Sequence, residues 1–196
     1  MIDPAATREA LVAAATAEMA EKGLDGASLD AICARAGFTR GAFYVHFRDR
    51  DDLLVAVVER VLERTHAELE LDSPTPDLRQ LIPRFAARIR EGKPAAVGTP
   101  AWQFRHTLAA CARIPKLRDR YVALQRGAVK QVGAAIKAGQ REGTVRSEVD
   151  ADATAEIMVM VSLGIAAALE LGMPFDLNAG AEALEQLVTV RPRKRR

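Results

Sequence analysis

Apolar residues recur every three or four positions along most of the chain, which is the period of one face of an α-helix. Leu29, Ile32 and Ala36 form one such stripe, and a longer stripe runs through residues 50–70. No segment shows the strict alternation of apolar and polar residues that a half-buried β-strand requires. The pattern therefore predicts an all-α protein.

Helix boundaries follow from capping residues in the first fifty positions. Asp3, Ser28 and Thr39 each stand just before a helical stripe, where a short polar side chain can accept a hydrogen bond from the first turn. Gly23 and Gly37 are the expected stops of the first two helices, because glycine tolerates the left-handed conformation that ends many helices. The spacing thus predicts three helices before a long fourth one at about 50–70.

Five further segments carry helical stripes toward the C-terminus. The expected helices lie at about 78–89, from Thr99 and Pro100 onward, at 115–141, from Asp150 or Asp152 to near Gly172, and at about 178–190.

The segment SLDAICARAGFTRGAFYVHF, residues 28–47, predicts two short helices joined by a turn at a glycine, which describes a helix-turn-helix. On the second of these helices Phe43 and Phe47 are four residues apart and share a face, so we expect both in the core. Gly41, Tyr44 and Val45 lie on the opposite face of the helical wheel. We expect that face, with Arg48 at its end, to be exposed.

Charge is distributed unevenly although the formal total is only +2. Residues 35–50 hold four arginines against one aspartate, whereas residues 1–34 hold two basic against six acidic side chains. A local excess of positive charge is what contacts with nucleic-acid phosphates require.

Residues 5–54 resemble the DNA-binding half of the tetracycline-repressor-like (TetR) transcriptional regulators. The resemblance is carried by GLDGASLDAICARAGFTRGAFYVHFRDRDDLL, above all by Ala-Gly before the turn, by Tyr44 and Phe47, and by the basic and acidic residues that precede a long helix. The family often carries lysine where this chain has Arg50. The C-terminal part is similar to the family only in the number and length of its helices.

The resemblance implies a DNA-binding role for seven residues. Ser28 would bind a phosphate, and Tyr44 would contact a phosphate or a thymine methyl. His46 and Arg50 would contact the flanking DNA backbone. The N-terminal end of the recognition helix would reach bases or the adjacent backbone through Thr39, Arg40 and Gly41.

The implied organisation is a helix-turn-helix domain at residues 1–50, a helical ligand-binding and dimerisation domain at 51–190, and a basic tail at 191–196.

Residues 153–171 hold only two charges, so we expect this helix and the one at 178–190 to pair with a second copy in a homodimer. Burial within one chain is the alternative. An effector pocket, for a ligand of unknown identity, is expected among residues that mix bulk with polar groups: Trp102, Phe104, Arg105, Leu108, Cys111, Tyr121, Met158 and Ser162.

Several classes of function are disfavoured. His46, His66 and His106 are isolated, the two cysteines lack metal-ligand spacing, and neither a phosphate-binding glycine loop nor a serine elbow is present. We therefore expect no enzyme, no cofactor and no metal.

The longest uncharged apolar run, residues 157–169, is short for a membrane span, so a cytoplasmic protein is expected. The favoured function is a ligand-responsive repressor of a palindromic double-stranded operator. Co-repression by the ligand stays open, and a helical small-molecule carrier without DNA-binding activity is the alternative.

Overall fold

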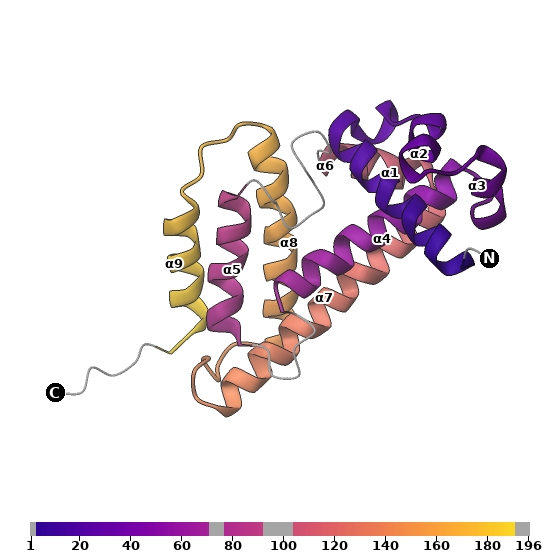
Figure 1. The fold of residues 1–196 in the computed structure, drawn as a ribbon. Helices are drawn as coiled ribbons and strands as arrows, with labels where there is room; N and C mark the ends of the chain where they lie inside the picture. Colours follow the sequence, from indigo (N-terminus) through magenta and orange to yellow (C-terminus); the bar gives the residue numbers. More distant parts are fainter. Residues whose placement is uncertain (1–2, 71–76, 92–103, 191–196) are drawn as a thin grey trace. The chain divides into compact units, whose positions relative to one another are not determined.

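The fold was analysed in a computed structural model that describes residues 3–70, 77–91 and 104–190. Within these residues every regular element is a helix, and the helices fall close to the predicted segments (Figure 1). The helices are α1 (Pro4–Gly26), α2 (Leu29–Ala36), α3 (Arg40–His46), α4 (Arg50–Glu68), α5 (Leu78–Arg90), α6 (Phe104–Arg113), α7 (Pro115–Arg141), α8 (Ala151–Glu170) and α9 (Leu177–Val188). The prediction of an all-α fold is confirmed.

The chain forms two compact units. Unit 1 takes in the described residues up to Glu63 and those from Phe104 to Ala123. Unit 2 takes in those from Arg64 to Glu91 and from Leu124 to Val190. These units group residues by packing, whereas the predicted division into 1–50 and 51–190 concerns function and stays a prediction.

Unit 1 is built around the first three helices, which pack on one another. Its core holds fully buried side chains from α1, α2, α3 and α4, among them Leu11, Ile32, Phe43 and Leu53. The start of α4 is buried almost continuously from Leu53 to Val58. Because α4 begins only four residues after α3 ends, this burial fixes the end of the helix-turn-helix to its support.

Helices α4 and α7 run side by side in unit 1 and are joined by ion pairs (Figure 1). Lys116 of α7 donates to Asp52, and Arg120, about one turn further along α7, donates to Glu59, about two turns further along α4. The hydrogen bond from Lys116 lowers the pKa of Asp52 below its ordinary value. The first two turns of α7 are thereby tied to α4.

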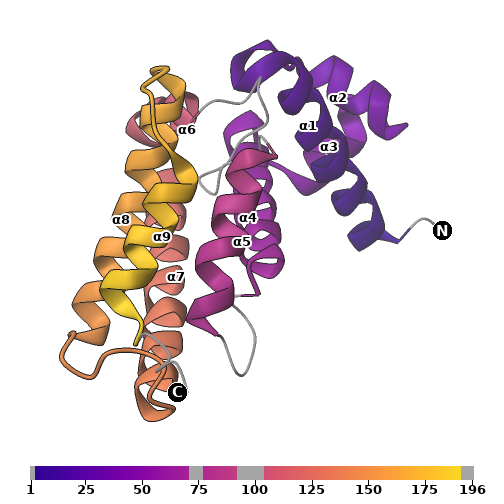
Figure 2. The same ribbon diagram turned by 90° about the vertical axis from the view of Figure 1, so that its left-hand side faces the viewer.

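Unit 2 packs α5, α8, α9 and most of α7 around a core that includes Leu78, Val132, Ile136, Ala155 and Val159. Helices α5 and α9 lie side by side (Figures 1 and 2). A single antiparallel bridge between Val145 and Thr189 fastens the loop after α7 to the end of α9.

Most predicted caps are confirmed. Asp3, Ser28, Thr39 and Asp150 each accept a hydrogen bond from the first turn of the helix that follows. Gly23 leaves helical geometry at φ 78°, but the chain re-enters a helical turn that ends at Gly26, so the first helix extends three residues beyond its expected stop. The predicted opening of a helix at Thr99, the pocket residue Trp102 and the basic tail lie outside the described residues.

Candidate nucleic-acid interface and effector cavity

The turn between α2 and α3 is closed by backbone hydrogen bonds around one glycine. Gly37 adopts φ 75°, and its N–H donates to the carbonyl of Ala34 at 3.1 Å. The next N–H, that of Phe38, donates to the carbonyl of Cys33 at 2.9 Å. These bonds satisfy the last carbonyls of α2 and fix the direction in which α3 leaves the turn.

Helix α3 has one buried and one exposed face, as the sequence predicts. Phe43 and Phe47 are 0% and 2% exposed, and their rings stack with centroids 5.4 Å apart. On the other face Tyr44 is 55% and Val45 78% exposed. The centroid of the Tyr44 ring lies 5.2 Å from that of Phe43, with the two rings nearly perpendicular, so the buried face also orients the exposed tyrosine.

Two of the four arginines in residues 35–50 are engaged within the chain. Arg35 of α2 makes a bidentate ion pair with Glu21 and a further one, at 2.8 Å, with Glu18 of α1. Arg50 donates to the backbone carbonyls of Leu24 and Ala27. Counting all four arginines as available to phosphate overstates the charge, because sequence alone does not show which cations have intramolecular partners.

The other two arginines stand on the surface. Arg40, at the start of α3, pairs with Asp30 of α2 at 3.2 Å, and Arg48 lies 4.0 Å from Asp52. Because both side chains of the Arg40–Asp30 pair are exposed, the pair contributes little to stability, and a phosphate can replace the carboxylate at small cost.

The predicted DNA contacts gather on the helix-turn-helix. Ser28, Thr39, Arg40, Gly41 and Tyr44 are exposed, whereas His46 and Arg50 are half-buried. The oxygens of Ser28 and Thr39 accept backbone N–H groups at 3.1 and 3.3 Å, so each hydroxyl hydrogen can still be donated to a phosphate. That these seven residues contact DNA stays a prediction.

Glu18 is a structural residue that the sequence pattern does not reveal. Its side chain is buried in α1, yet it forms ion pairs with Lys22 at 2.6 Å and Arg35 at 2.8 Å. The adjacent bidentate contact with Arg35 lowers the pKa of Glu21. Since a buried carboxylate is retained only when it is paired, this cluster fixes α2 against α1.

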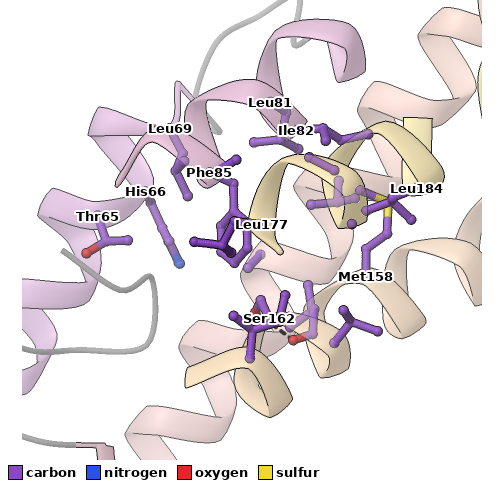
Figure 3. A pocket seen from close by; sticks show the side chains of 18 of the residues that line it. Thr65, His66, Leu69, Leu81, Ile82, Phe85, Met158, Ser162, Leu177 and Leu184 are labelled. Carbon is purple, nitrogen blue, oxygen red and sulfur yellow. Dashed lines mark hydrogen bonds between the residues drawn. The ribbon is translucent and has the colours of Figure 1, made fainter. Parts of the chain in front are cut away.

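Unit 2 contains a partly open cavity of about 170 Å³ that is lined by the end of α4 and by α5, α7, α8 and α9 (Figure 3). Of the predicted pocket residues, Met158 and Ser162 line it. Phe104, Arg105, Leu108, Cys111 and Tyr121 belong to unit 1 and are not part of its wall. The walls are mostly aliphatic and aromatic side chains that sequence reasoning did not single out, namely Leu69, Leu81, Ile82, Phe85, Ile165, Phe175, Leu177 and Leu184.

The polar groups of the cavity come from three helices. Thr65 and His66 stand in the last turns of α4, Gln125 on α7 and Ser162 on α8. Arg88 donates to the hydroxyl of Thr65 at 3.3 Å and forms an ion pair with Glu68. The positive charge of Arg88, next to the cavity wall, is therefore balanced by the carboxylate of Glu68.

Helix α4 connects the two features along the chain. It begins at Arg50, four residues after α3 ends, and its last turns supply Thr65 and His66 to the cavity. Among the residues that the structure describes, no group of three or more His, Cys, Asp and Glu side chains could hold a metal ion.

Comparison with known proteins agrees with this geometry. The family of bacterial regulatory proteins named after tetR matches residues 11–57, which span α2, α3, most of α1 and the first part of α4. The HTH-type transcriptional repressor BepR of Brucella suis biovar 1 (strain 1330) is 26% identical over 168 residues, which cover 80% of this chain and 77% of BepR. BepR is a transcriptional repressor by name.

Solved structures extend the likeness to the whole fold. The reduced form of E. coli NemR superposes with a TM-score of 0.74 at 20% identity, covering 95% of this chain and 98% of NemR. SmeT, the repressor of the Stenotrophomonas maltophilia multidrug efflux pump SmeDEF, gives a TM-score of 0.66 at 25% identity, covering 94% and 91% of the two chains. A complex of SmeT with triclosan gives 0.69 at 24% identity, covering 95% and 93%. Residues 11–57 of this chain thus match the tetR family of bacterial regulatory proteins, and its fold is similar to those of NemR and SmeT.

Proposed function

We propose that the protein represses transcription by binding a palindromic operator as a homodimer, and that a small molecule bound in unit 2 releases it. The observation that carries the DNA-binding half is the exposed face of α3. Tyr44 and Val45 are held out to solvent by a helix whose opposite face is buried. A helix presented in this way, with Arg40 at its N-terminal end, suits insertion into the major groove.

The dimer is supported by the surface of α8. This helix has the length and composition of a membrane span, yet only 17% of its most apolar stretch is buried within the chain. Ile157 and Met160 of α8 and Leu187 of α9 are all more than half exposed. A second copy that packs α8 and α9 against their equivalents would cover these side chains in a four-helix bundle.

The dimer also accounts for operator recognition. One recognition helix reaches only a few base pairs, and a symmetric pair would contact two half-sites about 34 Å apart. An operator with two-fold symmetry follows from this arrangement.

The effector is supported by the cavity and by the course of α4. A ligand that displaces the last turns of α4 acts on the helix whose first turn supports α3. The bound triclosan of SmeT shows that a related repressor accepts a small molecule. Because coupling between two binding sites is reciprocal, effector and operator would weaken each other by the same factor, roughly 5- to 150-fold for 1–3 kcal/mol.

The experiment that tests this function is DNA binding at two salt concentrations. Duplexes selected from the source genome would be titrated with the full chain, with fluorescence anisotropy as the readout. A dimer that contacts six to ten phosphates should lose about 10³ to 10⁵ in affinity between 50 and 200 mM salt. A small-molecule carrier without DNA-binding activity would bind no duplex even at the lower concentration, and that result would refute the proposal.

A further inference from the structure

The cavity of unit 2 is small for a ligand site. Its volume of about 170 Å³ is close to that of an engineered cavity of roughly 150 Å³, lined by Leu, Ile and Phe, that binds benzene in another protein. Pockets for drug-sized ligands commonly measure about 300–1,000 Å³. The space therefore suits a single ring with a short substituent.

The chemistry of the wall disfavours a net charge on that ring. Among the described residues that line the cavity there is no Asp, Glu, Lys or Arg, His66 is the one ionisable side chain, and the nearby Arg88 is already paired with Glu68. A carboxylate or ammonium group placed against this largely apolar wall would lose most of its hydration, which is costly. A neutral ligand avoids this cost.

One wall offers a fixed hydrogen-bond acceptor. The hydroxyl of Ser162 donates to the carbonyl of Val159 at 2.7 Å, so its hydrogen is used within α8 and its oxygen lone pairs are left to accept. Figure 3 shows Ser162 on the α8 side of the cavity and His66 on the α4 side. A hydroxyl group on the ring would match such a wall.

Phe175 stands at the open edge of the cavity, on the loop between α8 and α9. It lines the cavity and is also 46% exposed, so its ring stands where the cavity meets solvent. The ring rests on Gly180 of α9: a Cβ built at residue 180 would lie 2.6 Å from Cζ of Phe175, which is closer than such atoms approach. The absence of a side chain at Gly180 therefore creates the seat that Phe175 occupies.

We propose that the cavity takes one uncharged aromatic ring bearing a hydroxyl group, a simple phenol, and that Phe175 seated on Gly180 limits the site to a single ring. This inference rests on the proposed function only in treating the cavity as the effector site. Phe175 is here a specificity-determining residue, because removing its ring would lengthen the cavity toward solvent.

The test is calorimetric binding of four probes to the full chain without DNA: phenol, benzoate, benzylamine and 2-naphthol. Phenol should bind at least about tenfold more tightly than benzoate, than benzylamine in its ammonium form, and than 2-naphthol. Benzoate or benzylamine binding as tightly as phenol would overturn the assignment of a neutral ligand.

Two variants test the limit on size. Phe175→Ala should raise the affinity for 2-naphthol relative to phenol at least about tenfold, and Gly180→Ala should shift the ratio in the same direction by displacing the ring from its seat. Gly127→Ala in α7 is the matched control, because a Cβ there meets no atom within 4 Å. An unchanged ratio in both Phe175→Ala and Gly180→Ala would overturn the role of Phe175.

The same probes separate this inference from the proposed function. If phenol binds the protein but does not release it from its operator, the regulatory proposal fails and the ligand assignment stands. If charged or larger compounds release the protein from DNA while phenol does not bind, the assignment fails and the regulatory proposal stands.

Discussion

Arg50 donates a hydrogen bond through Nη2 to the backbone carbonyl of Ala27 at 3.3 Å, which ties the first residue of α4 to the segment just before α2. The same atom also donates to the carbonyl of Leu24. A residue that the family resemblance assigns to the DNA backbone thus has partners inside the domain.

Replacement of Arg50 by lysine should reduce stability, because the single ammonium group cannot reproduce the planar fork of the guanidinium. Hydrogen bonds to charged groups contribute about 1.5–3 kcal/mol, so we expect the free energy of unfolding to fall by about 1–2 kcal/mol in Arg50→Lys. Urea denaturation measures this change. Arg48→Lys, at a side chain that is 77% exposed, is the control and should leave stability unchanged. Full stability in Arg50→Lys would show that the contacts with α1 contribute nothing.

Gly41→Ala tests whether the space next to Gly41 is needed by the fold or by bound DNA. A Cβ at Gly41 would meet the Thr39 hydroxyl oxygen at 3.6 Å, an ordinary contact, so the fold tolerates it. Alanine should keep or raise Tm, since it favours helix by roughly 0.5–1 kcal/mol over glycine. Operator affinity should nevertheless fall at least about tenfold, because the methyl group would meet a base edge or the DNA backbone.

The control for that substitution is Gly127→Ala in α7, where a Cβ meets no atom within 4 Å. It should raise Tm without changing operator affinity in anisotropy titrations. Equal operator affinity of Gly41→Ala and the wild type would mean that α3 does not approach DNA closely at its first turn.

Ile157→Glu should convert a dimer into monomers. Ile157 is 62% exposed in the isolated chain, so glutamate costs little within the monomer, whereas a buried interface would hold two unpaired carboxylates. Sedimentation velocity measures the change, and operator affinity should fall with it because the paired half-sites are lost. Val45→Glu is the matched control at another exposed apolar position and should impair DNA binding alone. Identical sedimentation of Ile157→Glu and the wild type would exclude α8 from the interface.

The Asp52–Lys116 pair predicts a dependence of stability on acid pH. Because Lys116 depresses the pKa of Asp52 in the folded state, this carboxylate contributes stability that is fully present above its ordinary value of 3.8 and is lost as the pH falls through the lower, folded value. Lys116→Met should therefore be less stable than the wild type at neutral pH, and the difference should shrink below about pH 4.

Denaturation between pH 2 and 7 checks this expectation. Lys130→Met, at an exposed lysine on the same helix, serves as the control and should show no such convergence with the wild type. A Lys116→Met difference that stayed constant down to pH 2 would mean that the pair contributes through packing and not through charge.

The sequence by itself determined the helices, their caps and the two faces of α3. These features depend on residues no more than four positions apart, such as Ser28 with Ala31 or Phe43 with Phe47, and helical geometry fixes such neighbours without reference to the rest of the chain. That is why the recognition face could be predicted before any tertiary contact was known.

Only the tertiary structure decided which charges are available and where the cavity lies. Arg35 meets Glu21 across 14 positions and Arg50 meets Ala27 across 23, while the cavity joins residues from Thr65 to Leu184. The predicted pocket residues between 104 and 121 have the composition of a ligand site, but they pack in the other unit. The type of a residue determines which interactions its side chain can make. Which side chains meet depends on contacts between segments far apart in the sequence, and these contacts form only when the helices pack.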